Sequence, residues 1–256
     1  MSDSLRSPTS LPPDPPALWH SLSEGLRALL ECQQLLLASP LLRLAPRGDG
    51  HPVMTLPGFG GADGCMAPLR SWMKRWGYDA RPWTLGRNFP KYRMTSLEDA
   101  MRFRKKMVRR AAGQVENIYR ETGQKVSLVG WSLGGLYAHE VGQLHPRWVR
   151  QVVTLGTPHG DPRGTAAWNL MRRIYRSDVP ENLQDVGAWV AANSARQSVP
   201  MTVIFSPSDG IVSQEVAMLN HPAVRHLAVN SSHLGFAMNP RVYWLLARQL
   251  ARPIAV

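Results

Sequence analysis

The stretch "KVSLVGWSLGGLYAHE", residues 125–140, joins an apolar run to a helix-like pattern and decides the fold. Between its two halves stands GWSLG, residues 130–134, which fits the pattern G-x-S-x-G. A sharp turn from strand to helix with this pattern presents the serine hydroxyl at the top of a sheet. Gly130 and Gly134 keep the neighbouring positions small enough for the turn to close. We therefore predict a buried strand, an accessible Ser132, and a helix that begins directly after it.

Apolar runs typical of strands alternate with helical patterns on both sides of this stretch. The strand candidates are residues 51–58, 79–85, 125–131, 149–156, 200–206 and 224–229. The helix candidates are residues 65–77, 97–122, 134–144 and 239–251. Strands that alternate with helices indicate an α/β protein with a mostly parallel sheet, here of about six strands, covered by helices on both faces. Sites in such sheets gather at the carboxyl ends of the strands.

The remaining segments divide the chain into a tail, a helical segment and the α/β domain. Residues 1–16 are rich in Pro and Ser and predict a disordered tail. Residues 17–48 are mostly helical in pattern, and residues 49–256 form the domain, with a cap over about 161–199. The helical segment carries apolar residues at spacings of three and four. They are Leu18, Trp19, Leu22, Leu26, Leu29 and Leu30. Packing on the domain is the simplest role for this segment; pairing with another subunit or lying on a membrane stay open.

Composition and charge limit the classes of function that this chain can have. The 256 residues suit one domain with a full core, and the formal net charge is +12. A basic chain favours an anionic membrane surface or an acidic partner. Nucleic acid is not expected, because no zinc-finger spacing, RNA-recognition signature or basic zipper is present. The densest basic run is expected on the outer face of a helix. It comprises Arg102, Arg104, Lys105, Lys106, Arg109 and Arg110.

Cysteine use and the chain start indicate a cytoplasmic protein. Cys32 and Cys65 are the only cysteines, too few for a disulfide framework, and we expect both to be small buried hydrophobes. The start MSDSLRSPTSLPPDPP lacks a basic segment followed by an apolar run, so it is no secretory signal. No apolar stretch approaches the ~20 residues that span a bilayer. Peripheral membrane association remains an alternative.

A serine in a nucleophile elbow needs a base, and the base needs an orienting acid, in the chain order Ser, Asp or Glu, His. His233 follows the last strand in "AVNSSHLGFAMNP", where a loop can reach Ser132. Asp209 follows the strand at 200–206, and Asp161 is the second candidate for the acid. Backbone N–H groups of Leu133, after the nucleophile, and of Phe59, in the loop after the first strand, are the candidate oxyanion donors.

These residues together resemble the α/β-hydrolase superfamily, from about residue 51 to 250. The resemblance rests on LPGFGG (56–61), on GWSLGG (130–135) and on the pair Asp209 and His233. It implies a serine esterase or lipase. The stretch LGTPHG (155–160) looks like the segment that shapes the pocket in many lipases. The pocket candidates are Trp131, Pro158 and His159, and a structural role is the alternative for His159.

The chain also departs from the family's pattern. Many lipases carry His-Gly before the oxyanion donor, where this chain has Pro57-Gly58. The first two strands of the full family fold have no clear counterpart, so six strands are expected. In the family the cap often forms a lid. Its apolar candidates here are Trp168, Leu170, Met171, Ile174, Tyr175, Val186 and Trp189. An apolar lid suits an acyl-chain substrate, and a plain helical cap that only shields the site from water is the alternative.

Three hypotheses for the function follow from these observations. The first is hydrolysis of carboxylic esters through an acyl-enzyme on Ser132. The second keeps the nucleophile but takes an acyl-carrier ester or thioester, or transfers the acyl group. The third is a non-catalytic scaffold of hydrolase type used for binding or membrane association. None of them requires a metal or a cofactor, and no metal-ligand spacing is present in the sequence.

Overall fold

A computed structural model of the chain describes residues 12–92, 96–166, 168, 186–190 and 197–254. Within these residues, six strands form one parallel sheet in the order β2-β1-β3-β4-β5-β6. The strands are β1 (Pro52–Leu56), β2 (Asp79–Pro82), β3 (Val126–Trp131), β4 (Val149–Leu155), β5 (Met201–Phe205) and β6 (Val224–Ala228). This sheet confirms the predicted strands, each within three residues of the predicted bounds.

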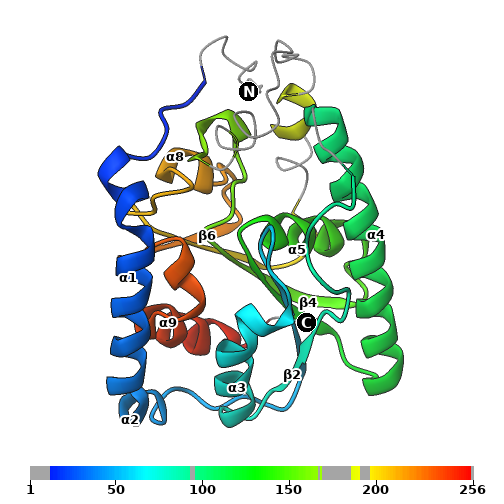
Figure 1. The fold of residues 1–256 in the computed structure, drawn as a ribbon. Coiled ribbons are helices and arrows are strands. Elements are labelled where there is room, and N and C mark those ends of the chain that lie inside the picture. The colour runs from blue at the N-terminus through cyan, green and yellow to red at the C-terminus, as the bar shows by residue number, and fades with distance from the viewer. Residues whose placement is uncertain (1–11, 93–95, 167, 169–185, 191–196, 255–256) are drawn as a thin grey trace.

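Helices cover both faces of the sheet (Figure 1). The α-helices are α1 (Leu18–Leu37), α2 (Ser39–Leu42), α3 (Ala67–Arg75), α4 (Leu97–Thr122), α5 (Leu133–Leu144), α8 (Gln214–Ala217) and α9 (Pro240–Leu250). Short 3-10 turns occupy η1 (Asp63–Met66), η2 (Pro162–Gly164) and η3 (Leu234–Ala237). Helices α4 and α5 pack on one face, and α3 and α9 pack on the other.

The central strands explain why the sheet is buried on both sides. Strands β1, β3 and β5 are buried at every position. Successive side chains on a strand point to opposite faces. Leu128 therefore packs in the core beneath α4 and α5, while the next residue, Val129, packs in the core beneath α3 and α9. An uninterrupted apolar run is the expected pattern for a parallel strand covered by two helical layers.

Helix α4 begins and ends where its sequence predicts. The hydroxyl of Ser96 accepts a hydrogen bond from the N–H of Asp99 at 3.1 Å, which caps the first turn. Gly123 closes the helix with φ of 67°, a left-handed conformation that glycine adopts without a steric penalty. The start of α4 lies near the carboxyl end of β3, since Leu97 and Ser132 line the same cavity.

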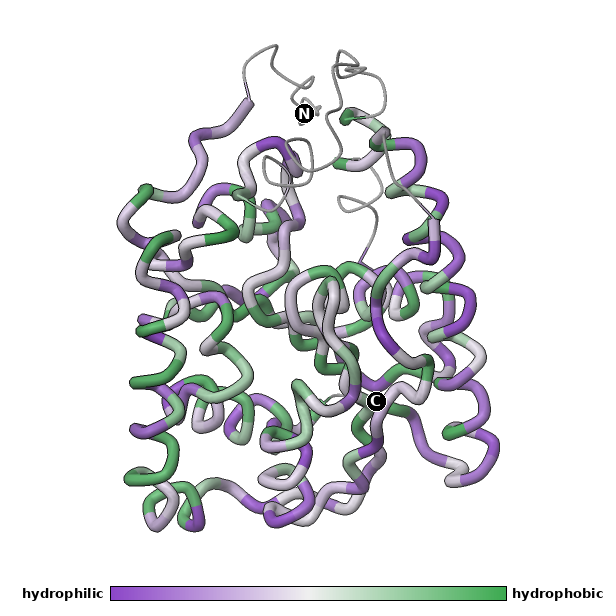
Figure 2. Tube along the Cα trace, viewed as in Figure 1, coloured by the Kyte–Doolittle hydropathy of each residue, from purple (hydrophilic) through white to green (hydrophobic). Residues whose placement is uncertain are grey.

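Helix α1 packs on the domain, which is the simplest role predicted for this segment, and it packs through its polar face. Glu24, Glu31 and Leu35 are its buried residues. The six apolar residues of the predicted stripe are exposed instead, with exposed fractions from 47% to 78%. Figure 2 shows hydrophobic positions recurring along the outer side of this helix, at the left edge of the molecule. The stripe therefore does not make the packing contact, because the polar face finds hydrogen-bond partners in the domain's loops.

Three further expectations need correction or limits. Neither cysteine is buried: Cys32 is half-buried and Cys65 is exposed. Arg104 does not lie on the outer face with the rest of the basic run. It is buried, pairs with Glu140 at 2.8 Å, and stacks over Trp189. Residues 1–11 of the predicted tail and the lid candidates Leu170, Met171, Ile174 and Tyr175 lie outside the described residues.

Among the described residues, no helix combines the length and apolarity that a bilayer-spanning helix needs.

Candidate active site

Ser132 stands at a strained turn between β3 and α5. Its φ of 53° and ψ of −126° are rare for a residue other than glycine. The hydroxyl of Thr157 donates to the carbonyl oxygen of Ser132 at 3.0 Å, and the N–H of Ser132 donates to the carbonyl oxygen of Leu155 at 2.8 Å. These bonds to the end of β4 and to the loop after it hold the turn and leave the Ser132 side chain on the upper edge of the sheet.

The glycines around Ser132 are required by close backbone approach. A Cβ on Gly130 would overlap the backbone of residues 134 and 135. A Cβ on Gly134 would lie 2.6 Å from the carbonyl oxygen of Pro57, well inside van der Waals contact. Gly58 lies close to the serine from the other side, because a Cβ there would be 3.0 Å from Cβ of Ser132. The elbow and the loop after β1 therefore meet with no room for side chains.

The structure brings Ser132, His233 and Asp209 together across a sequence span of 101 residues. Nε2 of His233 lies 2.9 Å from Oγ of Ser132, and Nδ1 of His233 lies 2.8 Å from Oδ2 of Asp209. The second carboxylate oxygen of Asp209 accepts hydrogen bonds from the N–H groups of Ile211 and Val212, both at 2.8 Å. Asp209 is thereby fixed on one side while it orients the imidazole on the other. The three side chains come from loops after β3, β5 and β6.

The surroundings of His233 favour its protonated form. Burial lowers the pKa of His233, but the negative charge and hydrogen bond of Asp209 and the charge of Glu24 outweigh burial, so the pKa is raised from its ordinary value. These negative charges stabilise the imidazolium that would form if His233 took a proton from a serine.

Glu24 of α1 joins the loop of the acid to the loop of the histidine. Its Oε1 accepts from the N–H of Gly210 at 2.8 Å and from the N–H of His233 at 2.9 Å. Its Oε2 accepts from the N–H of Leu234 at 3.0 Å. Glu24 is 5% exposed, so these three bonds replace water around the carboxylate. One side chain thus fixes the backbone on both sides of the Asp209–His233 pair.

The rest of the inner face of α1 binds the same two loops. The Ser21 hydroxyl donates to the carbonyl oxygen of Gly210, and the Arg27 guanidinium donates to the carbonyl oxygen of Ser208, both at 2.6 Å. Glu31 accepts from the N–H of Ser232 at 2.8 Å and from the hydroxyls of residues 231 and 232. Burial raises the pKa of Glu31, although its hydrogen bonds oppose that shift.

Sequence reasoning missed this inner face, although it left a signal. Ser21, Glu24, Arg27 and Glu31 recur at spacings of three and four, so they share one side of the helix as the leucines share the other.

Asn88, also missed from sequence, braces the loop of the candidate oxyanion donor. Its side-chain amide donates to the carbonyl oxygen of Pro57 at 2.9 Å and accepts from the Tyr137 hydroxyl at 3.1 Å. Its backbone exchanges hydrogen bonds with Gly60 and Gly61 at 2.8 and 2.7 Å. Asn88 is fully buried. The loop of residues 57–61 is therefore held in place beside Ser132 by a residue on the segment after β2.

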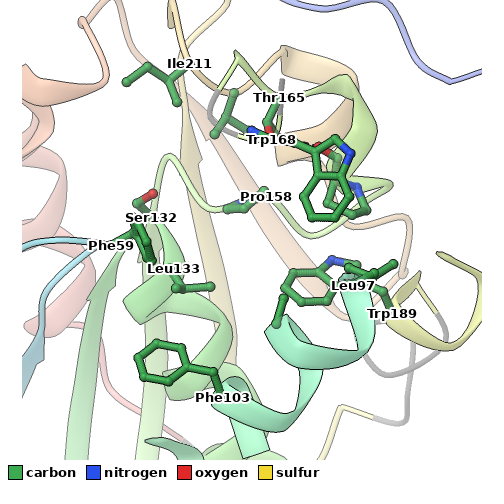
Figure 3. Close-up of a pocket in the computed structure, with 13 residues that line it drawn as sticks. Phe59, Leu97, Phe103, Ser132, Leu133, Pro158, Thr165, Trp168, Trp189 and Ile211 are labelled. Atoms are coloured by element: carbon green, nitrogen blue, oxygen red, sulfur yellow. Dashed lines mark hydrogen bonds between the residues drawn. The ribbon is translucent and has the colours of Figure 1, made fainter. Parts of the chain in front are cut away.

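An apolar cavity of about 90 Å³ opens at Ser132 (Figure 3). The two candidate oxyanion residues, Phe59 and Leu133, line it beside the serine. Leu97, Trp168 and Trp189 face them across the cavity. The remaining described lining residues are Ala100, Phe103, Pro158, Pro162, Thr165, Ile211 and Val212. Leu97 and Phe103 come from α4, so the capped start of that helix forms one wall.

Of the three pocket candidates, only Pro158 is among the described lining residues. Trp131 instead donates its indole N–H to the carbonyl oxygen of His233 at 3.0 Å, which places it behind the histidine. His159 is buried with its Nε2 near the Thr154 hydroxyl, at 3.2 Å. Burial lowers the pKa of His159 well below its ordinary value, so the ring is neutral. Trp131 therefore supports His233 from behind, whereas His159 lies in the core beside β4.

Two other polar groups resemble parts of the site but do not take part in it. Asp161, the second candidate acid, pairs with Arg163 at 2.6 Å rather than with His233. A second Ser–His–Asp arrangement joins Ser127, His51 and Asp49, with His51 Nε2 2.7 Å from the Ser127 hydroxyl. Ser127 lies inside β3 with no exposed surface, so no substrate can approach it. Location at the carboxyl edge therefore distinguishes Ser132.

Comparisons with known proteins agree with this architecture. No family model matches the chain, and no curated protein matches its sequence. Solved structures do match. The mature lipase BlEst2 of Bacillus licheniformis superposes with a TM-score of 0.59 at 16% identity, covering 81% of this chain and 94% of that one. A monoacylglycerol lipase of Paleococcus ferrophilus superposes with a TM-score of 0.55 at 15% identity, covering 81% of this chain and 96% of that one. A putative non-heme bromoperoxidase of Mycobacterium tuberculosis superposes with a TM-score of 0.55 at 18% identity, covering 80% of this chain and 92% of that one.

These neighbours define the class of fold. The six-stranded parallel sheet, the strand-to-helix turn at Ser132 and the superposition over about four-fifths of the chain identify an α/β-hydrolase fold. Similarity at 14–19% identity establishes the fold alone, and the chemistry depends on the residues of the site. Among the described residues, no three His, Cys, Asp or Glu side chains lie close enough together to hold a metal ion.

Proposed function

We propose that this chain is a serine hydrolase that cleaves carboxylic esters through an acyl-enzyme on Ser132. The observation that carries the proposal is the chain of hydrogen bonds from Ser132 through His233 to Asp209, at 2.9 and 2.8 Å. A serine hydroxyl is a poor nucleophile until a base takes its proton. The imidazole is placed to do so, and the buried carboxylate holds its Nδ1–H so that Nε2 faces the serine.

The reaction runs in two halves. Oγ of Ser132 attacks the ester carbonyl carbon while Nε2 of His233 takes the hydroxyl proton. The tetrahedral intermediate collapses, and His233 returns that proton to the departing alkoxide, which leaves as an alcohol. Water then gives a proton to His233 and attacks the acyl-enzyme. As the second intermediate collapses, His233 returns that proton to Oγ of Ser132, the acyl–oxygen bond breaks, and the carboxylic acid leaves.

The oxyanion donors in this proposal are the N–H groups of Leu133 and Phe59. Leu133 is the first residue of α5, and the N–H groups in a first helical turn have no partner within the helix. Phe59 follows Gly58, whose close approach to Ser132 brings the loop within reach of the same point. Each such donor contributes about 3 kcal/mol to the transition state. The bracing of this loop by Asn88 supports a preorganised hole.

The apolar lining favours an apolar acyl group. We expect kcat/KM to rise from p-nitrophenyl acetate to the butyrate, because each methylene moved from water into an apolar site contributes ~0.8 kcal/mol, or about fourfold. Two methylenes then give roughly a 15-fold rise. Equal values for the two esters would contradict an acyl site in this cavity.

A labelling experiment tests the mechanism directly. A fluorophosphonate probe should label the wild-type chain and leave Ser132→Ala unlabelled, and the same variant should lose ester turnover. Ser127→Ala is the matched control, because Ser127 also contacts a histidine that pairs with an aspartate but is buried in β3. Labelling that persists in Ser132→Ala and disappears in Ser127→Ala would overturn the proposal.

An acyl-carrier thioester is the second candidate substrate. The observation that favours it is the arrangement of α4, which lines the cavity with Leu97 and Phe103 and exposes basic residues on its outer side. The exposed ones include Arg102, Lys105, Lys106, Arg109 and Arg110. An acidic carrier protein would be steered toward this helix. Activity on carrier-bound acyl groups would then fall steeply with salt, while activity on a neutral p-nitrophenyl ester would not.

A further inference from the structure

Helix α1 turns its charged residues inward and its leucines outward. Its acidic residues are Glu24 and Glu31, which are 5% and 7% exposed and bind loops of the domain. On the opposite side, Leu22 is 78% exposed and Leu37 is 82% exposed. A surface helix of a globular protein normally shows the reverse arrangement. The outward side of α1 is therefore suited to contact an apolar environment.

The exposed apolar side chains of α1 and α2 form one band, which we call the leucine face. Its members are Leu18, Trp19, Leu22, Leu26, Leu29, Leu30, Leu36, Leu37, Leu41 and Leu44. Their exposed fractions and ordinary side-chain sizes give roughly 1,000 Å² of apolar surface, against about 300–600 Å² for the largest patch on a typical monomer. Figures 1 and 2 show that α1 forms an outer edge of the molecule, with this face directed away from the sheet.

Between Leu18 and Leu44 the exposed charge is positive, and the nearest exposed acidic residue before this stretch is Asp14. Between residues 18 and 44 the only acidic side chains are the two buried glutamates, so the band exposes no negative charge. Arg43 is exposed at the end of α2. Arg241 of α9 is exposed and lines the same hollow as Leu30, and it also lines a second hollow with Leu41. The chain as a whole carries +12.

We propose that the leucine face lies on an anionic lipid surface, with α1 in the plane of the membrane interface. A helix of this kind buries an apolar side in the acyl boundary while nearby basic residues meet anionic headgroups. Trp19 lies at one end of the band, and tryptophan is enriched at membrane–water boundaries. The proposal uses neither Ser132 nor its cavity, so it stands apart from the proposed hydrolase activity.

A second copy of the chain fits the face less well than lipid does. At 100° per residue the band on α1 covers about 120° of the helix, wider than the narrow seam that a pair of helices buries. Part of the band would therefore stay in water in a two-helix contact, whereas an apolar phase covers all of it. Two copies at +12 each would also repel one another, and an anionic surface would attract both.

The test uses the full-length chain and vesicles of defined composition. The protein is sedimented with vesicles of phosphatidylcholine alone and of phosphatidylcholine mixed with phosphatidylglycerol. We expect binding to the mixed vesicles, weaker binding to the neutral ones, and partial release by ~0.5 M salt, which screens headgroup attraction. The triple variant Leu22→Gln, Leu29→Gln and Leu36→Gln should bind the mixed vesicles at least about tenfold more weakly, because three apolar anchors are lost.

The control is Leu144→Gln, which changes a leucine that is 61% exposed on α5, outside the leucine face. It should bind as the wild type does. All four positions are exposed, so thermal unfolding should be nearly unchanged in every variant.

Three outcomes would overturn the proposal. One is that the protein stays in solution with both kinds of vesicle. Another is that the triple variant binds as tightly as the wild type, which would place lipid binding on the basic side of α4. The third is absence of vesicle binding together with a dimer, seen by light scattering, that the triple variant splits. That result would assign the leucine face to a second copy.

Discussion

Glu24→Gln is the substitution that tests most sharply whether α1 holds the site together. The carboxylate accepts three backbone hydrogen bonds, from Gly210, His233 and Leu234, at 2.8 to 3.0 Å. Glutamine keeps one oxygen, which can serve the first two donors, but its NH₂ group then meets the third N–H, donor against donor. Loss of one charge-assisted bond costs about 1.5–3 kcal/mol, and an unsatisfied buried N–H costs about 1–3 kcal/mol. We expect the free energy of unfolding to fall by about 3 kcal/mol.

The same substitution should change the pH dependence of ester turnover. The charge of Glu24 helps to raise the pKa of His233. Removing that charge lowers the pKa, so His233 becomes neutral, and able to act as a base, at lower pH. The acid limb of kcat/KM should therefore move toward lower pH in Glu24→Gln. The value of kcat should fall more than KM changes, because Glu24 does not line the cavity.

Glu31→Gln is the matched control on the same helix. Glu31 is also buried, but two of its three donor groups are serine hydroxyls, which can rotate and accept from the new amide. The N–H groups of Gly210 and His233 donate to Glu24 and not to Glu31. Urea unfolding should show a smaller loss of stability than in Glu24→Gln, and the acid limb should stay in place. The reasoning would be refuted if Glu24→Gln kept the wild-type stability and the wild-type acid limb of kcat/KM. An equal shift of the acid limb in Glu24→Gln and Glu31→Gln would refute it too.

Three further predictions concern the loop, the elbow and the base. Asn88→Ala should lower kcat by about tenfold or more and lower the free energy of unfolding by about 2–4 kcal/mol, because the Pro57 carbonyl and the buried Tyr137 hydroxyl lose their partner. Steady-state kinetics and urea unfolding check this, and an unchanged kcat would count against a braced oxyanion loop. Gly134→Ala should destabilise the fold by about 3 kcal/mol or more, because the new Cβ would press on backbone oxygens. The control Gly113→Ala in α4 should stabilise the fold by about 0.5–1 kcal/mol, because no other atom lies within 4 Å of the new Cβ. Equal melting temperatures for the two variants would contradict this prediction. In the wild type, the acid limb of kcat/KM should lie above the ordinary histidine value of about 6.5, because the raised pKa of His233 keeps the base protonated to higher pH; a limb near pH 6 would argue against the described surroundings of the base.

The sequence by itself determined the positions of the strands along the chain, the turn at Ser132 and the bounds of α4. Each of these is a local property. A buried parallel strand shows as an unbroken apolar run, a sharp elbow requires small neighbours, and a helix end shows in its capping residues. Chain order and position after a strand also sufficed to choose His233 as the partner of Ser132, because loops after parallel strands meet at one edge.

Tertiary structure alone decided which face of α1 packs. Helical periodicity separates an apolar side from a polar one, but it does not say which side meets the domain. The outcome depended on backbone N–H groups in loops more than 180 residues away, which carboxylates of α1 satisfy and leucines could not. The roles of Arg104 and Asn88 were hidden for the same reason. A polar residue becomes buried where distant partners satisfy it, and those partners become neighbours only when the chain folds.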